Sequence, residues 1–221
     1  AFVTGAAGNL GKAVVQKFLD NGYKVTGTVF HPAPASNSME QPGFQAVPVD
    51  LNNEEACNNL VQSIISDYGS INVAVLTVGG FAMGNISSTT TGALREQFKL
   101  NVETAYNLAR PVFEQMQKQG SGRIFFVGAR TPLLPAEAKN AVAYSLAKSL
   151  IFRLAEMINE EAKGSDVVAM VVVPSIIDTP SNREAMPSTN PDDWVSPSAI
   201  ADVIYWYTTP EAAMIREPVI K

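Results

Sequence analysis

The strongest constraint on the fold is a glycine-rich loop that lies between a short apolar run and an amphipathic segment. The loop reads T-G-A-A-G-N-L-G over residues 4–11, with the glycine spacing G-x-x-G-x-x-G. Val14, Val15, Phe18 and Leu19 then share one side of a segment that ends at Gly22, which predicts a helix. Residues 23–30 follow as a β-rich strand. Strand, glycine loop, helix and strand in this order are the context of a dinucleotide-binding motif.

Glycines lack a Cβ, so the backbone of such a loop can approach a pyrophosphate closely. The pyrophosphate then lies at the positive N-terminus of the helix. The sequence therefore favours nucleotide binding over the alternative, a tight turn without a ligand. The loop residues expected to contact the nucleotide are Gly5, Gly8, Asn9, Leu10 and Gly11.

Strand-like and helix-like segments alternate along the rest of the chain. Continuous apolar runs at residues 71–78 and 167–173 favour central parallel strands that are buried on both faces. Further strands are expected over residues 44–49 and 123–127. Helices are expected over about residues 53–68, 91–119, 141–163 and 197–208, with caps at Asn53 and Ser196 and with Pro111 kinking or breaking the longest helix.

This alternation predicts a single-domain α/β fold of the Rossmann type, a doubly wound and mainly parallel sheet with helices on both faces. Residues 1–221 contain no repeat and no linker, so we expect one nucleotide-binding domain. The chain starts within an apparent strand and stops at the start of another. We therefore expect a few residues to be missing at each end.

Composition excludes several classes of function. The net charge is −5 and Lys and Arg do not cluster, which argues against a nucleic-acid partner. The longest apolar runs are too short to span a bilayer. A single cysteine, Cys57, cannot form an intrachain disulfide, so we expect a cytoplasmic setting and a packed rather than a nucleophilic thiol. One histidine and one cysteine leave little for a zinc or iron site, and we expect no metal.

Catalytic chemistry is indicated by the segment A-V-A-Y-S-L-A-K-S-L-I at residues 141–151. It places Tyr144 and Lys148 four residues apart, on one face of a predicted helix. A nearby ammonium favours the phenolate and so lowers the pKa of a tyrosine, as a general acid/base for a carbonyl or alcohol requires. Because such a pair also arises by chance, its meaning depends on what else the chain carries.

Together these features resemble the short-chain dehydrogenase/reductase family over essentially the whole chain. Five features occur in the family's order: the glycine loop, Asp50-Leu51 after the third strand, Asn101 in the long helix, Tyr144 with Lys148, and P-S-I-I-D-T-P at residues 174–180. Taken singly, each of these has an ordinary structural explanation. Their order is what favours the family.

The resemblance implies a role for each matching residue. Tyr144 would exchange a proton with the substrate oxygen, Lys148 would bind the nicotinamide ribose and lower the tyrosine's pKa, and Asn101 would hold a water of a proton relay. Asp50 and Leu51 would border the adenine, and residues 174–179 would hold the carboxamide end of the nicotinamide. The cofactor-contacting residues expected from this loop and from the diglycine after the fourth strand are Pro174, Ile177, Thr179, Gly79 and Gly80.

The chain also departs from the family pattern. Strand alignment puts Ala129 where the family carries a serine that hydrogen-bonds the substrate oxygen, and Thr131 is the nearest hydroxyl that could replace it. The usual N-N-A-G after the fourth strand is T-V-G-G here, at residues 77–80. With the loop spacing, these departures are similar to dihydropteridine reductase and other divergent members, which indicates a branch and not a substrate.

Cofactor choice depends on the end of the second strand. NAD-specific members carry an acidic residue there, and counting puts Val29 at that position. No arginine follows for a 2′-phosphate, although His31 could donate to one. We therefore favour NADP(H), with NAD(H) still possible.

The leading functional hypothesis is an NAD(P)(H)-dependent oxidoreductase that interconverts a carbonyl and a secondary alcohol, under a short lid at about residues 180–195. The alternative is a cofactor-binding sensor or scaffold with weak or no catalysis, because the usual serine is absent. A nucleotide-sugar epimerase or dehydratase would need a large C-terminal domain for which the chain has no room. The apolar residues 150–158 and the resemblance together lead us to expect a homodimer or homotetramer, although monomer packing explains the same pattern. The substrate itself is not encoded in any readable motif.

Overall fold

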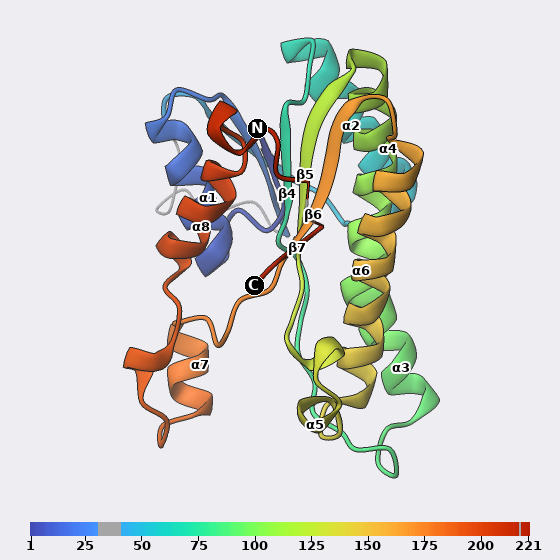
Figure 1. Cartoon of the computed structure of the whole chain (residues 1–221), viewed down its shortest axis with the longest axis vertical. Coiled ribbons are helices and arrows are strands. Elements are labelled where there is room, and N and C mark those ends of the chain that lie inside the picture. The colour runs from blue at the N-terminus through green and yellow to red at the C-terminus, as the bar shows by residue number, and fades with distance from the viewer. Residues whose placement is uncertain (31–40, 217) are drawn as a thin grey trace.

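The structure, a computed structural model, describes residues 1–30, 41–216 and 218–221, and it is built on one parallel sheet (Figure 1). The seven strands of the described part lie in the order β3-β2-β1-β4-β5-β6-β7, and every pairing between them is parallel. The strands are β1 (Phe2–Val3), β2 (Val25–Val29), β3 (Phe44–Pro48), β4 (Val73–Leu76), β5 (Ser121–Val127), β6 (Asp166–Val172) and β7 (Val219–Ile220). The predicted Rossmann-type α/β fold is confirmed.

Helices cover both faces of this sheet, as Figure 1 shows. On one face lie α1 (Asn9–Asp20) and α8 (Pro197–Trp206), which are joined by an ion pair of 2.7 Å between Lys17 Nζ and Asp202 Oδ1. The other face carries α2 (Glu54–Tyr68), α4 (Thr104–Gln119) and α6 (Val142–Glu161). Each face has its own apolar core, with Phe18 and Phe125 in the first and Leu108 and Phe126 in the second.

Short elements gather where the strands end. They are α3 (Thr91–Phe98), α5 (Pro135–Ala138) and α7 (Pro180–Ala185), with the single turns η3 (Thr131–Leu133), η4 (Pro191–Asp193) and η5 (Pro210–Ala212) elsewhere in the loops. In Figure 1, α5 and α7 both lie below the sheet, beyond the carboxyl ends of the central strands. None of the helices in the described ranges is both long and apolar enough to cross a membrane.

Local sequence signals set the helix ends as predicted. The side chain of Asn53 accepts a hydrogen bond from the Ala56 N–H at the start of α2, and the Ser196 hydroxyl accepts one from the Ala199 N–H at the start of α8. Cys57 is fully buried in α2, where burial raises the pKa of its thiol to about 11. The interpretation of Cys57 as a packed residue is confirmed.

Of the kink or break predicted at Pro111, the break does not occur. Pro111 is buried within α4, and the helix continues through it from Thr104 to Gln119. The long helix is instead interrupted earlier, by the π-helical segment η2 (Lys99–Glu103), where the Thr104 N–H bonds to the Lys99 carbonyl five residues back. A π-helical segment inserts a residue into the helix and often marks a functional position. Asn101 lies at its centre and is buried.

The strand order creates a switch point between β1 and β4. The chain leaves β1 towards β2 and β3 on one side and returns to β4 on the other. Ligands of open parallel sheets bind outside the carboxyl ends of the strands at such a point. Gly27 of β2 keeps this region tightly packed, since a Cβ there would lie 2.5 Å from the Cβ of Ala6 and 2.8 Å from the Phe44 ring.

We therefore predict that Gly27→Ala lowers the free energy of unfolding by about 1–3 kcal/mol, because the added methyl overpacks the contact between β2 and the glycine loop. Urea denaturation measures this change. Gly92→Ala on the exposed start of α3 is the control, since a Cβ there would meet only the Thr90 hydroxyl of the described residues, at 3.5 Å. Equal stability of the Gly27→Ala variant and the wild type would show that the loop relaxes freely.

Candidate active site

Tyr144 and Lys148 lie one turn apart on α6 and face the same side of the helix. Lys148 is only 6% exposed, and its Nζ donates a hydrogen bond of 2.7 Å to the carbonyl of Val127, at the end of β5. The same Nζ lies 5.9 Å from the centre of the Tyr144 ring. Helical spacing therefore brings a phenol and an ammonium together at the carboxyl edge of the sheet.

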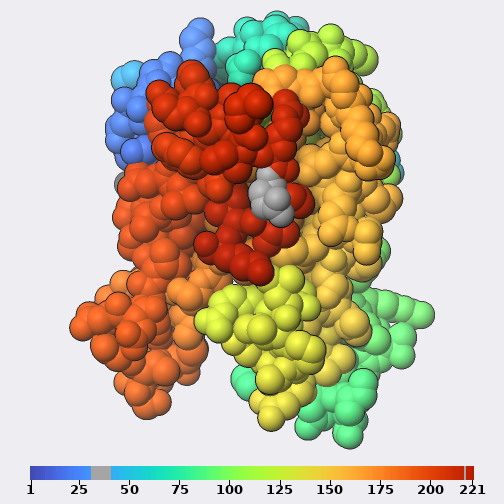
Figure 2. Space-filling model, in the orientation of Figure 1, coloured from blue at the N-terminus to red at the C-terminus, as the bar shows by residue number. Residues whose placement is uncertain are grey.

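Both side chains line a cavity of about 680 Å³. Its walls come from the strand ends, from the segment around η3 and from the lid, which contributes Asn182 and Met186. In Figure 2 the orange lid and the yellow-green segment around residue 135 stand apart at the lower edge, with a notch between them. The predicted site residues that line the cavity are Leu10, Gly79, Gly80, Thr131, Tyr144, Lys148, Pro174 and Ile177.

The remaining predicted residues of the described part do not line this cavity. They are Gly5, Gly8, Asn9, Gly11, Asp50, Leu51, Asn101 and Thr179. His31 lies outside the described residues. Asn101 is 1% exposed and lies directly behind the diglycine, with which it exchanges two hydrogen bonds: its Nδ2 donates to the Gly80 carbonyl at 3.0 Å, and its Oδ1 accepts from the Gly80 N–H at 3.1 Å.

Burial governs the protonation of the Tyr144–Lys148 pair. It lowers the pKa of Lys148 to about 8 and raises the pKa of Tyr144 to about 12. The expectation that Lys148 lowers the pKa of Tyr144 is therefore wrong for this structure. The reason is desolvation, which disfavours the charged form of both groups and outweighs their attraction across the pair.

The glycine loop has the geometry that a pyrophosphate needs. Gly5 adopts a positive φ of 61°, and a Cβ on Gly11 would lie 2.1 Å from the Gly5 carbonyl oxygen, so both positions require glycine. Gly8 is the N-cap of α1, and no side chain caps this helix. Exposed Gly8 and Asn9 thus leave the first N–H groups of α1 open to an anion, which fits a dinucleotide cofactor.

A pair of threonines fixes this loop against β4. The Thr4 hydroxyl accepts hydrogen bonds from the N–H groups of Thr77 at 2.8 Å and Val78 at 3.2 Å. In return, the Thr77 hydroxyl donates to the Thr4 carbonyl at 2.6 Å. The T-V-G-G variant therefore replaces side-chain amides by a threonine that connects the two strands at the switch point.

Asp50 and Leu51 form the loop before α2. The carboxylate of Asp50 accepts hydrogen bonds from the backbone and the side chain of Asn52, which lower the pKa of Asp50. The carbonyl of Leu51 accepts a hydrogen bond of 2.9 Å from Asn107 of α4. Asn107 is a residue that the sequence reasoning missed, because no local pattern connects positions so far apart in the chain.

The segment after β6 carries the lid. Asp178 and Arg183 form a two-pronged ion pair of 2.6 and 2.9 Å. The Thr179 hydroxyl accepts the Asn182 N–H at 3.1 Å and so caps α7, instead of pointing freely into the cavity. Ile177 pairs with Val195 in an isolated bridge, which closes the base of the lid. Residues 177–195 thus form a short flap with a fixed base.

Two positions decide which hydroxyl can meet a substrate oxygen. Ala129 lines the cavity and carries no donor, as the alignment predicted. Thr131 lines it as well, and its hydroxyl is buried without a hydrogen-bond partner in the described part of the chain. An unsatisfied buried hydroxyl costs free energy, and the Thr131 hydroxyl oxygen is enclosed in the structure and not exposed to the cavity.

Phe81 is a cavity residue that the sequence reasoning missed. Its ring is 62% exposed and meets the Tyr144 ring edge-on, with 5.0 Å between the ring centres. This contact holds the orientation of the phenol. The only signal in the sequence was its place directly after the diglycine.

Val29, the expected ribose position, is the last residue of β2 and is buried. The next side chain, Phe30, is 75% exposed. Neither Val29 nor Phe30 is acidic, so neither position offers a carboxylate to a ribose 2′-hydroxyl.

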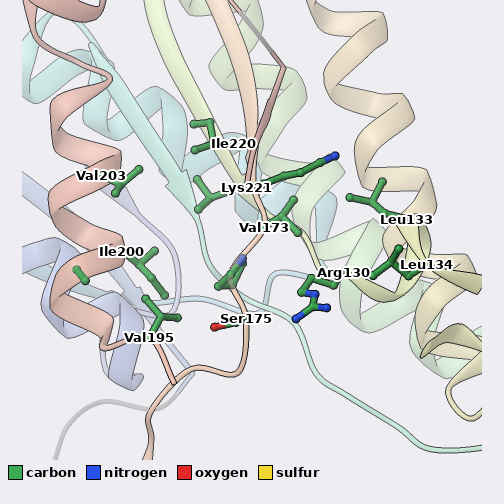
Figure 3. A pocket seen from close by; sticks show the side chains of 13 residues that line it. Arg130, Leu133, Leu134, Val173, Ser175, Val195, Ile200, Val203, Ile220 and Lys221 are labelled. Carbon is green, nitrogen blue, oxygen red and sulfur yellow. The ribbon is translucent and has the colours of Figure 1, made fainter. Parts of the chain in front are cut away.

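A second, apolar cavity of about 520 Å³ lies next to the first and shares Arg130, Pro174 and Ser175 with it. Figure 3 shows Leu133 and Leu134 on one side and Ile200 and Val203 of α8 on the other. Tyr144 and Lys148 do not line it. Arg130 lies at the border of both cavities and forms an ion pair of 2.7 Å with Glu137.

Fold and site together define an α/β protein with a dinucleotide-type glycine loop and a tyrosine–lysine pair at its switch point. Comparison with known proteins identifies the family: residues 1–190 match the family model of the short chain dehydrogenases. The chain belongs to this family of oxidoreductases.

Among curated relatives, the chain is 28% identical over 190 residues to the acetoacetyl-CoA reductase of Acinetobacter sp. (strain RA3849), covering 81% of this chain and 75% of that protein. It is 27% identical over 157 residues to 2,3-dihydro-2,3-dihydroxybenzoate dehydrogenase of Bacillus subtilis (strain 168), covering 69% of this chain and 60% of the relative. A solved structure described as ElxO with NADP bound shares the fold with a TM-score of 0.89, at 21% identity over 99% of this chain and 94% of its own.

The buried lysine generates a prediction about stability. Below about pH 8 the ammonium of Lys148 is charged in the folded and the unfolded protein, and the folded state bears the full desolvation penalty. As the pH rises from about 8 towards the unfolded-state value of about 10.4, the unfolded chain binds more protons, so stability increases with pH. Lys148→Met removes the penalty, and we expect it to raise the free energy of unfolding by about 1–3 kcal/mol at pH 7.

Urea denaturation from pH 7 to pH 10 measures this effect, and the advantage of Lys148→Met over the wild type should shrink across the range. Lys139→Met is the control, because Lys139 is exposed on the same side of the molecule. An advantage that stays constant with pH would show that packing, and not the buried charge, is responsible.

Proposed function

We propose that this chain is an NAD(P)(H)-dependent oxidoreductase that interconverts a carbonyl and a secondary alcohol within one Rossmann-type domain. The observation that carries the proposal is the meeting of Tyr144 and Lys148 in one cavity beside the glycine loop. The carbonyl reductase and the alcohol-type dehydrogenase among the relatives support this reaction class.

A bound nicotinamide cofactor supplies or accepts the hydride of this reaction. The chain's own residues manage the proton. Tyr144 is neutral at working pH because burial holds its pKa at about 12, so its phenol donates a proton to a carbonyl oxygen that gains negative charge. The ammonium of Lys148 donates a hydrogen bond to the Val127 carbonyl at the end of β5. With a cofactor bound, the ammonium would donate to the ribose hydroxyls instead of this carbonyl or in addition to it. In the reverse direction Tyr144 would accept the alcohol proton only after its own proton has left through the relay.

Thr131 completes the oxygen site in this proposal. Its hydroxyl donates to the same substrate oxygen as Tyr144 and takes the place of the serine absent at Ala129. The hydroxyl has no other partner in the described part of the chain, and because it is buried, this role requires the side chain to turn towards the cavity. Asn101 bonds the backbone of Gly80 and so holds the diglycine next to Lys148. In this proposal Asn101 also holds the water of the proton relay.

For the cofactor we propose NADP(H) before NAD(H). The end of β2 offers no carboxylate at Val29 or Phe30 to bind a ribose 2′-hydroxyl or to repel a 2′-phosphate. His31 remains the proposed donor to that phosphate. Asp50 and Leu51 would border the adenine, and Pro174, Ile177 and Thr179 the nicotinamide carboxamide.

We further propose a cytoplasmic homodimer or homotetramer. The outer surfaces of α4 and α6 expose large apolar side chains, namely Tyr106, Leu146, Leu150 and Met157. A second copy of the chain would cover them.

A second candidate function is a cofactor-binding sensor or scaffold with weak or no catalysis. Ala129 favours it, because the cavity has lost a hydroxyl next to the substrate oxygen. The two candidates differ in a single measurable property, turnover that depends on Tyr144.

Tyr144→Phe tests the proposed function. We expect fluorescence titration to show micromolar binding of NADPH and weaker binding of NADH to both the wild type and the variant, because the phenol hydroxyl is not needed for the glycine loop to bind. Turnover in a screen of carbonyl substrates should fall by about 10²–10⁴ in the variant, since the general acid is lost. Unchanged turnover would refute the tyrosine mechanism. If neither cofactor binds, the glycine loop is a tight turn without a ligand and the proposed function fails.

Thr131→Val tests the replacement of the serine. Valine keeps the shape and removes the hydroxyl, so we expect kcat to fall by about 10²–10³, as for the loss of one oxyanion donor, while cofactor affinity stays the same. Adding Ala129→Ser to this variant should restore part of the rate by returning the hydroxyl to the family's position. A Thr131→Val variant with wild-type kcat would show that the reaction proceeds without a second donor.

A further inference from the structure

Gln97 is a buried glutamine one helical turn before Asn101. It is 7% exposed near the end of α3, close to the start of the π-helical segment η2. A buried carboxamide requires hydrogen-bond partners. The partner of Gln97 is the side chain of Asn101.

Three oxygen atoms surround Nδ2 of Asn101. They are the side-chain Oε1 of Gln97 at 3.1 Å, the backbone carbonyl of Gln97 at 3.2 Å and the carbonyl of Gly80 at 3.0 Å. A flipped amide would place Oδ1 against all three acceptors and leave it facing no donor. Gln97 supplies two of these three acceptors and so favours the orientation in which the Asn101 amide bonds both the N–H and the carbonyl of Gly80.

The orientation of Asn101 in turn fixes the wall of the cavity. Its two hydrogen bonds to Gly80 hold both the N–H and the carbonyl of that residue. A Cβ on Gly79 would lie 2.6 Å from Asn101 Oδ1 and 3.1 Å from Lys148 Nζ. The diglycine is thus the spacer between Asn101 and the ammonium of Lys148, and both glycines line the cavity.

We propose that Gln97 is a positioning residue for the nicotinamide end of the site. It orients the Asn101 amide, and through Asn101 it holds the diglycine wall at the distance that Lys148 and the cofactor need. This inference rests on the proposed function for the cofactor, whereas the contact between Gln97 and Asn101 stands independently of it.

Gln97→Met tests the proposal, because methionine matches the length of glutamine and removes the acceptor. We expect the affinity for NADPH to fall by about three- to tenfold, the range of one lost hydrogen bond. The Gly80 N–H should exchange with solvent faster than in the wild type, while the N–H groups of β5 and β6 keep their protection. In an Asn101→Ala background, Gln97→Met should change neither quantity, because its effect passes through Asn101.

Gln119→Met is the matched control. Gln119 is also a partly buried glutamine, and its Nε2 donates to the carbonyls of Ile71 and Ser121, both at 2.7 Å, at the opposite end of the sheet. It should lower stability without changing NADPH affinity or Gly80 exchange. Gln97→Asn, which keeps an amide but is one methylene too short, serves if the methionine variant does not fold.

Wild-type NADPH affinity and wild-type Gly80 exchange in Gln97→Met would overturn the proposal. An equal loss of affinity in the Asn101→Ala background would also overturn it, since Gln97 would then act by another route. If the wild type binds neither NADPH nor NADH, the proposed function fails, and Gly80 exchange alone then decides whether Gln97 orients Asn101.

Discussion

A parallel sheet that is buried on both faces has only its strand ends available for polar chemistry. Here helices cover both faces, and β1, β2, β4 and β6 are almost entirely buried. Each functional side chain must therefore come from a loop at the carboxyl edge or from a helix that passes close to it. The strand order places the largest gap between such loops beside β1 and β4, so the glycine loop, the diglycine and the start of α6 meet there. The geometry of the site follows from the topology before any catalytic residue is chosen.

The buried ammonium of Lys148 lowers the free energy of unfolding, because its charge is desolvated at this edge of the sheet. Lys148 loses most of its hydration, and its hydrogen bond to the Val127 carbonyl returns part of that free energy. The same apolar surroundings keep Tyr144 protonated. Desolvation thus weakens the fold at this edge, and pKa shifts of this kind are common at active sites. The segment after β6 is held by the Ile177–Val195 bridge and the Asp178–Arg183 ion pair.

Sequence reasoning recovered the parts of the molecule that depend on local patterns. The apolar runs became central strands, Asn53 and Ser196 became helix caps, and the four-residue spacing brought Tyr144 and Lys148 together. It failed where the outcome depends on contacts between distant segments. Pro111 does not break its helix because the surrounding core holds α4 in place, and the π-helical segment at Asn101 has no local signature. The raised pKa of Tyr144 depends on burial, which a spacing does not reveal.

The departures from the family pattern form a connected set. The family's N-N-A-G would place alanine at position 79, where a Cβ meets Asn101 Oδ1 at 2.6 Å and Lys148 Nζ at 3.1 Å in this backbone. Glycine at this position is therefore what permits Asn101 to approach the loop closely enough to bond both polar groups of Gly80. That approach leaves Nδ2 of Asn101 with a hydrogen to satisfy, and Gln97 accepts it. Thr77, which replaces the first asparagine, joins β4 to β1 through its hydroxyl and backbone N–H, and so supports the loop without an amide side chain. The diglycine, Gln97 and Thr77 are best understood as one alternative solution to the same physical problem, which is how to hold a lysine beside a bound nucleotide.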